Sequence, residues 1–389
     1  MFYHICALLL IGLVLGLAAV RRCSLYSPLV ICGLVWLVVF AVGLILHKRF
    51  YPIQEMAFIA WIIWFMATCL IFFLLYPSHI KNACNSTEIR RLPVDYTLPL
   101  LLLIIWLGYR FWIIGSSGPE HFFLNLRISA TNMMDGLAHL GFLERFSPLI
   151  FSLFLFEHIY AHRNNRHLRF LLWCCMLLYA VGSMSKLSIL TPFLSYSIIQ
   201  GISGRLKIRK IVILTSVIFA SMVSLHFIRA AVGDLSTLED LLAIYIYSPI
   251  VALGYIDIDS SLPFGAYVFR FFYVVGSYLD IVTIPAFTLG YAEVPEPTNV
   301  YTVMAPFYYD FGLLGILFGA FFYGLFFSYL YLKTVKGEKL ALALYSGYSI
   351  VLIMQFFDDV GFAFFSGNLQ ILIYTFAVFL ASRKVLYAR

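Results

Sequence analysis

The residues most able to carry chemistry lie together between positions 297 and 315, where the chain reads PTNVYTVMAPFYYDFGLLG. This stretch combines helix-breaking prolines, an amide, three tyrosines and one carboxylate, and it leads into an apolar run. Elsewhere the chain avoids polar residues, since 62% of its residues are hydrophobic and only 12% are charged. The concentration of polar groups therefore indicates a functional site rather than a simple connection.

Two residues in the chain are candidates for proton transfer. Asp310 directly precedes the apolar run 311–332, so we expect it to meet both a helix N-terminus and a low-dielectric boundary. His226 lies three residues before Arg229 and shares one helix face with it, at the end of the apolar run 211–228. A histidine there could act as a general base, although a lone histidine at a helix end is more often structural.

Four arginines within or beside apolar sequence form a second group of candidates. They are Arg127, Arg145, Arg229 and Arg270. An arginine at mid-bilayer costs about 2.5 to 3.5 kcal/mol, so these side chains should face a polar cavity or the headgroup layer. A guanidinium donates planar, bidentate hydrogen bonds to phosphate, and several at one membrane surface would suit a diphosphate attached to a lipid. The alternative is that they contact lipid headgroups or pair with acids such as Glu120, Asp135 or Asp234.

The composition predicts that these residues are positioned by a polytopic, all-α membrane protein. Mean hydropathy is +0.94 over 389 residues, and apolar runs of about 20 residues recur along the chain. Only helices and closed barrels satisfy their backbone groups in lipid, and the alternation typical of a barrel is absent. We therefore predict a single integral membrane domain, 1–389, with about 11 transmembrane helices and a range of roughly 10 to 13.

The predicted spans follow the apolar runs. In chain order they are 3–20, 27–46, 56–76, 96–114, 147–162, 170–184, 187–203, 211–228, 311–332, 340–357 and 361–382. The first span lacks a basic leader and a small-residue cleavage motif, so we interpret it as retained rather than as a cleaved signal peptide.

The distribution of Lys and Arg predicts the orientation of these spans. Most of the 26 basic residues fall on the cytoplasmic side if the N-terminus is outside and the C-terminus inside, with His47-Lys48-Arg49 as the exception. The net charge of +7 is then a topology signal, because a nucleic-acid binder would not divide its basic residues among short loops between apolar spans. Two long segments face outward on this topology, 115–146 and 229–310.

We expect the larger segment, 229–310, to contain short amphipathic helices at the membrane surface and no crossing. Ser236 and Glu239 have capping-box spacing and open a helix that we expect Pro249 to end, too early to span. Further on, Arg270 begins a polar stripe at helical spacing against phenylalanines, a pattern typical of a helix lying on a membrane. Two true crossings are the alternative.

The sequence lacks the residue patterns of disulfide frameworks, metal sites, nucleotide-binding sites and catalytic triads. The seven cysteines lie mostly in predicted spans and none has zinc-ligand spacing with histidine, so we expect neither a disulfide framework nor a metal site. Phosphate-cradling glycine motifs, nucleotide fingerprints and Ser-His-Asp arrangements are also missing. We expect no cofactor, which is consistent with a substrate that arrives already activated.

The stretch 297–315 resembles the signature of the Wzy-type O-antigen polymerases, which join oligosaccharide repeat units. In that family an Asn-x-Tyr-Thr segment and a Tyr-x-Asp-Phe-Gly-x-x-Gly segment precede the last three spans; here they are Asn299 to Thr302 and Tyr308 to Gly315. The N-terminal layout is also similar, with an opening span, a short basic turn and Leu25-Tyr26-Ser27-Pro28 leading into a span with Trp36. The resemblance covers the whole chain in layout and is specific in these patches.

The resemblance implies a GT-C-type membrane glycosyltransferase in the bacterial inner membrane with its active site facing the periplasm. It would transfer a growing glycan from undecaprenyl diphosphate to a repeat unit on a second undecaprenyl diphosphate, without a metal ion. Functional partners would be a chain-length regulator and a flippase. On this interpretation Arg229 and Arg270 bind the donor diphosphate and Arg127 binds the second lipid diphosphate, with Arg145 as a further diphosphate-binding candidate. Asp310 or His226 lies near the acceptor.

Sugars would be bound by flat and hydrogen-bonding side chains in the same stretch. The candidates are Asn299, Tyr301, Tyr308 and Tyr309, although tyrosines at this depth also form ordinary aromatic belts. Two other functions stay open. An O-antigen ligase or other lipid-glycan transferase has a similar layout. A polysaccharide transporter or flippase would instead show two matched halves with broken helices, and the sequence shows no such internal repeat.

Overall fold

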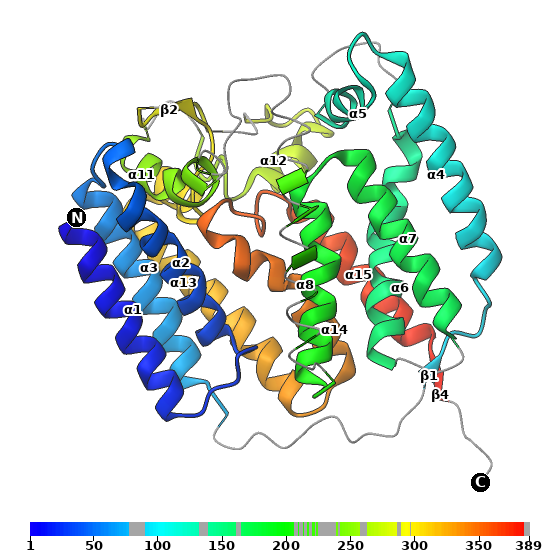
Figure 1. The fold of residues 1–389 in the computed structure, drawn as a ribbon, viewed down its shortest axis with the longest axis horizontal. Helices are drawn as coiled ribbons and strands as arrows, with labels where there is room; N and C mark the ends of the chain where they lie inside the picture. Colours follow the sequence, from blue (N-terminus) through cyan, green and yellow to red (C-terminus); the bar gives the residue numbers. More distant parts are fainter. Residues whose placement is uncertain are drawn as a thin grey trace. The chain divides into compact units, whose positions relative to one another are not determined.

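The computed structural model describes the chain except for residues 78–89, 132–138, 161–164, most of 206–241, 257–262, 286–288, 296 and 385–389. The described residues form an all-α structure, as predicted, with two antiparallel pairs of two-residue strands, β1 with β4 and β2 with β3 (Figure 1). The chain divides into two compact units.

The first unit comprises Met1–Ile80, Thr237–Leu332 and Val351–Asn368. Its elements are α1 (Phe2–Val20), α2 (Pro28–Leu46), η1 (His47–Arg49), α3 (Glu55–Leu74), η5 (Ala243–Tyr247), α11 (Ser248–Ala252), η6 (Leu253–Tyr255), α12 (Arg270–Ser277), β2 (Ala292–Glu293), β3 (Pro297–Thr298), most of α13 (Met304–Val335) and η7 (Met354–Phe356). Helix α2 packs against α1, α3 and η5. It begins where the hydroxyl of Ser27 accepts the Val30 N–H, with Pro28 in the first turn.

The core of this unit is held by one buried amide. The side-chain oxygen of Gln355 accepts hydrogen bonds from the indole N–H groups of Trp36 and Trp64, each at 3.1 Å. All three side chains are at most 2% exposed. The backbone carbonyl of Gln355 also accepts the Val303 N–H at 2.9 Å. Gln355 therefore connects α2 and α3 with the residues that lead into α13.

The second unit comprises Lys81–Ser236, Lys333–Ile350 and Leu369–Arg389. Its elements are β1 (Arg90–Arg91), α4 (Thr97–Ser117), α5 (Phe122–Thr131), η3 (Gly141–Phe146), α6 (Ser147–Tyr160), α7 (Arg166–Ser183), α8 (Lys186–Ile202), most of α14 (Lys339–Ile353), most of α15 (Phe365–Ala381) and β4 (Arg383–Lys384). Helix α7 packs against α4, α5, α6 and α8. Buried hydroxyls join the later helices to this group, since Ser195 donates to the Ser346 carbonyl at 2.9 Å.

Six helices among the described residues are long and apolar enough to cross a membrane. They are α1, α2 with η1, α3, α4, α13, and α14 with η7. Large apolar side chains remain exposed along one face of α1, as at Leu9 and Leu13, which are 70% and 61% exposed. Such faces suit contact with lipid, where the helix satisfies its own backbone groups. The chain is thus a polytopic membrane protein.

The helices follow the predicted spans closely, with one correction at Pro249. Span 211–228 lies largely outside the described residues, and the count of about 11 crossings stays a prediction. Pro249 does not end a helix, because α11 follows η5 directly and carries Pro249 in its first turn, where a missing N–H does no harm. Helical backbone therefore continues from Ala243 to Tyr255.

A short helical segment that the sequence did not predict precedes the helix that Asp310 was expected to open. Helix α13 runs from Met304, but its backbone is not helical at Gly312, so the long apolar segment starts within two residues of the predicted 311 and Asp310 lies in the short segment before it. The Thr302 hydroxyl accepts the Met304 N–H at 3.4 Å and so helps to start the helix earlier. Hydropathy could not show this start, because Tyr308, Tyr309 and Asp310 interrupt the apolar pattern.

Candidate functional site

The stretch 297–315, which the sequence analysis singled out, forms the loop before α13 and the bent first part of that helix in the first unit. Gly312 has φ 60° and ψ −148°, so two helical segments meet at this residue within α13. Only glycine adopts this region of backbone conformation readily. The bend separates Tyr308, Tyr309 and Asp310 from the long apolar part of the helix.

Asp310 holds the turn that precedes α12. Its carboxylate accepts the backbone N–H of Val268 at 2.8 Å and that of Tyr267 at 3.1 Å. The turn also contains Gly265, whose φ of +68° favours glycine. Because a charge-assisted bond to backbone N–H is stronger than a neutral one, this carboxylate fixes a segment 42 residues away in sequence.

Aromatic rings extend this contact. Tyr309 packs edge-on against Tyr267, with ring centroids 4.8 Å apart. Phe311 packs against Phe264 at 4.8 Å and against Phe269 at 5.9 Å. The segment 263–269 is therefore fixed by three successive residues of α13.

Tyr301 supports the loop before α13. It is 7% exposed, and its hydroxyl donates to the Gly290 carbonyl at 2.6 Å. Burial raises the pKa of the Tyr301 phenol to about 12, with a smaller contribution from the neighbouring Tyr267 phenol. Asn299 on the same loop is exposed, and Tyr308 is half-buried. The structure thus leaves Asn299 the more accessible of the predicted sugar-binding residues.

Arg270 is the first residue of α12 and follows directly on the turn that Asp310 holds. Its Nε donates to the Pro285 carbonyl at 3.3 Å, which orients the guanidinium. None of the residues of α12 is buried, and Phe272 is 62% exposed. This short helix with exposed rings agrees with the amphipathic pattern predicted for it.

Asp358 and Asp359 form a second group of acids in the same unit, between η7 and α15. The Tyr323 hydroxyl and the N–H groups of Gly361 and Phe362 all hydrogen-bond one oxygen of Asp359. Its other oxygen is buried and lacks a hydrogen-bond partner among the described residues. Burial raises the pKa of Asp359 to about 6, and burial together with the Asp359 charge raises that of Asp358 to about 7.

The remaining predicted residues lie elsewhere. Arg127 is half-buried on α5 and Arg145 is exposed in η3, both in the second unit. His226 and Arg229 lie outside the described residues. Sequence reasoning missed Tyr267, whose contacts with α13 span about 40 residues and leave no local pattern. Among the described residues there is no group of three His, Cys, Asp or Glu side chains that could hold a metal ion.

The helices define the class of this molecule, a polytopic α-helical membrane protein with a polar cluster beside the bend of α13. The sequence is 28% identical to an "O-antigen polymerase" of Shigella dysenteriae, in a match that covers 69% of this chain and 69% of the relative. The match confirms the resemblance to the O-antigen polymerases that the sequence predicted. No protein-family model and no solved structure matches the chain.

Proposed function

We propose that this protein is a polysaccharide polymerase of the bacterial inner membrane. It transfers a growing glycan from undecaprenyl diphosphate to a repeat unit carried by a second undecaprenyl diphosphate, at the periplasmic face, to build an O-antigen or a related surface polysaccharide. The observation that carries the proposal is the similarity to an O-antigen polymerase over 69% of the chain. It is supported by the contacts of Tyr309, Asp310 and Phe311 with segment 263–269, which Arg270 directly follows.

The proposed reaction needs a stabilised leaving group and a proton acceptor. The acceptor sugar's hydroxyl oxygen attacks the anomeric carbon of the donor glycan, and the bond from that carbon to the diphosphate oxygen breaks. The electron pair stays on the lipid diphosphate, where guanidinium groups stabilise the charge that develops, so no metal ion is required. The hydroxyl proton passes to Asp310 or to His226.

The residues have separate tasks in this scheme. Arg270, fixed by Pro285 and by the turn on Asp310, binds the donor diphosphate together with Arg229. Arg127 binds the second lipid diphosphate, and Arg145 contributes to anion binding on the same face. Asn299, Tyr308 and Tyr309 contact sugar, and Tyr301 supports their loop from beneath. Segments 115–146 and 229–310 are external, and 1–389 acts as one membrane domain.

Reconstitution tests the proposal. The purified chain in liposomes receives one defined undecaprenyl-diphosphate repeat unit and a chelator, and the products are separated on a gel. We expect a ladder of polymers from the wild type and its loss in Arg270→Ala. Arg270→Lys is the matched control, because it keeps the charge but not the bidentate geometry, and should retain a small part of the activity.

Other outcomes would assign a different function. Products joined only to added lipid A core would identify a ligase, and substrate moved across the bilayer without a ladder would identify a flippase. A ladder that disappears with chelator would show that a metal ion takes part. In cells, loss of a polymerase leaves single repeat units on the core, whereas loss of a ligase leaves none. The chain-length regulator and flippase proposed as partners would be expected to alter the ladder only in cells.

A further inference from the structure

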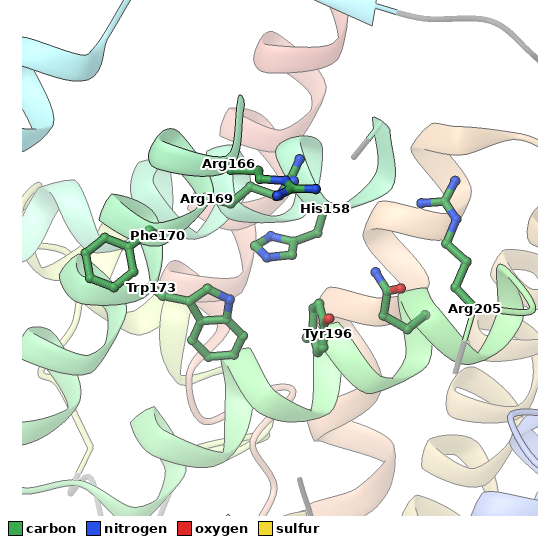
Figure 2. A pocket seen from close by; sticks show the side chains of 8 residues that line it. His158, Arg166, Arg169, Phe170, Trp173, Tyr196 and Arg205 are labelled. Carbon is green, nitrogen blue, oxygen red and sulfur yellow. The ribbon is translucent and has the colours of Figure 1, made fainter. Parts of the chain in front are cut away.

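The second unit contains a cavity of about 580 Å³ that the proposed reaction does not use. It lies among the end of α6, the start of α7, the end of α8 and the turn after α8 (Figure 2). Its lining includes Arg166, Arg169, Arg205, His158, Trp173 and Tyr196. Helices α7 and α8 are consecutive, so the start of the first and the end of the second lie at the same end of the pair.

The lining is strongly basic. Three of its eight residues are arginines and none is acidic. Arg166 and Arg169 are three residues apart on α7 and so share a face. Figure 2 shows both near His158, with Arg205 on the other side of the cavity. Three guanidinium groups around one space form a strong site for a phosphate, which accepts planar pairs of N–H bonds.

A buried polar atom forms part of the cavity wall. His158 is 3% exposed, and its Nδ1 lies 2.8 Å from the Phe154 carbonyl. Because a carbonyl can only accept, Nδ1 is the protonated nitrogen of the neutral ring. Nε2 has no hydrogen-bond partner within the described part of the chain, so it can accept a hydrogen bond from a hydroxyl group of a ligand in the cavity. Gln200, which is 7% exposed, adds a second polar side chain to the lining.

The walls and rim suit a lipid. The rings of Trp173 and Tyr196 stand edge-on to His158, at 5.9 Å and 5.2 Å, and offer apolar surface beside the polar atoms. Phe170 lines the same cavity and is 67% exposed. An exposed ring beside arginines at the ends of apolar helices is typical of a membrane interface, where basic pockets bind lipid headgroups.

We propose that this cavity binds the headgroup of an anionic phospholipid whose headgroup carries hydroxyl groups. The phosphodiester lies between Arg166, Arg169 and Arg205, a headgroup hydroxyl donates to Nε2 of His158, and an acyl chain leaves past Phe170. None of its lining residues is assigned a role in the proposed polymerisation. The same phosphate chemistry could come from a soluble phosphate ester, and the experiment distinguishes the two sources.

Thermal melting of the full-length chain in detergent measures binding without depending on activity. Phosphatidylglycerol, phosphatidylcholine and soluble glycerol 3-phosphate are titrated separately. We expect phosphatidylglycerol to raise Tm saturably, and the other two compounds to have little effect at the same concentrations. Arg166→Gln with Arg205→Gln should weaken the apparent affinity for phosphatidylglycerol about tenfold or more, because each basic side chain contributes near an anionic headgroup.

Both substituted arginines are exposed, so the variant is expected to fold. Lys336→Gln, which removes one exposed positive charge from the same unit, is the matched control and should bind like the wild type. Equal affinity in the double variant and the wild type would overturn the site. A shift with glycerol 3-phosphate as large as that with phosphatidylglycerol would overturn the lipid as its occupant. An affinity for phosphatidylglycerol that is unchanged in His158→Phe would overturn the role of His158.

Discussion

Asp310 combines a structural contact with a proposed chemical role, and the two can be separated. Its carboxylate accepts backbone N–H groups of Tyr267 and Val268. An asparagine in its place keeps an oxygen that can accept such a bond but cannot take a proton. An alanine removes both capacities and leaves two backbone donors without their partner.

We expect Asp310→Asn to keep the fold but to reduce polymer formation by about 100-fold or more, the usual contribution of a positioned proton acceptor. The measurement is the initial rate of ladder formation in liposomes. Asp310→Ala should lose activity and also lower Tm, because the turn before α12 is no longer held. If Asp310→Asn polymerised at close to the wild-type rate, Asp310 would be a purely positioning residue, and His226 would be the remaining predicted acceptor.

The acid pair Asp358 and Asp359 predicts a dependence of stability on pH. Folding raises the pKa of Asp358 from 3.8 to about 7 and that of Asp359 from 3.8 to about 6. The folded chain therefore keeps protons that the unfolded chain releases. The contribution of these two groups to the free energy of unfolding is greatest below about pH 4 and is lost as pH rises through about 4 to 7.

Melting in detergent at a series of pH values between about 4.5 and 7.5 checks this expectation. Asp358→Asn should flatten the decrease of Tm with pH, because it removes one buried titration and the repulsion between the two carboxylates. Glu55→Gln, at an exposed carboxylate in the first turn of α3, should leave the slope as in the wild type. An unchanged slope in Asp358→Asn would mean that Asp358 does not titrate in that range.

At the scale of the elements, the bend of α13 lies at a single residue, Gly312. Gly312 has positive φ in a region that other residues avoid, yet a Cβ added there would meet nothing within 4 Å. The penalty of Gly312→Ala is therefore a backbone penalty of about 1 to 3 kcal/mol. We expect this variant to lower Tm and to reduce polymer formation, because the bend orients Tyr309 and Asp310.

Gly16→Ala provides the matched control for this substitution. Gly16 lies within α1, and a Cβ there also meets nothing within 4 Å. The same methyl group in regular helix should be neutral or stabilising by up to about 1 kcal/mol. If both variants melted like the wild type, the bend at Gly312 would not be needed for stability.

Element positions could largely be predicted from the sequence, because lipid requires each crossing to be a long apolar helix. The predicted spans 3–20 and 27–46 differ from α1 and α2 by a single residue at one end. Hydropathy does not predict helical segments that contain polar residues, such as the start of α13. It also does not predict contacts between distant segments. No local pattern links Asp310 with Tyr267, so the sequence indicated the reactive groups but not the contacts that position them.

At the scale of the whole molecule, the basic residues carry the information on orientation. Lys and Arg are retained on the cytoplasmic side during insertion, so their distribution predicts an external N-terminus and a cytoplasmic C-terminus. The predicted orientation would put segment 229–310, with Arg270, in the periplasm. It would put Lys336, in the turn between α13 and α14, in the cytoplasm. The proposed polymerisation requires the first of these placements, because its donor and acceptor are periplasmic.

Cysteine labelling in intact cells tests this orientation. The starting variant has its native cysteines replaced by serine, and single cysteines are then introduced as Leu279→Cys, at a side chain that is 67% exposed, or as Lys336→Cys. A membrane-impermeant maleimide that reaches the periplasm should label Leu279→Cys in intact cells, and Lys336→Cys only after the inner membrane is opened. The reverse pattern would place the Asp310 and Arg270 cluster on the cytoplasmic face, where it could not meet a periplasmic substrate. We predict one crossing, α13, between the two positions. Labelling of both positions in intact cells would contradict this prediction, because it would require an even number of crossings between them.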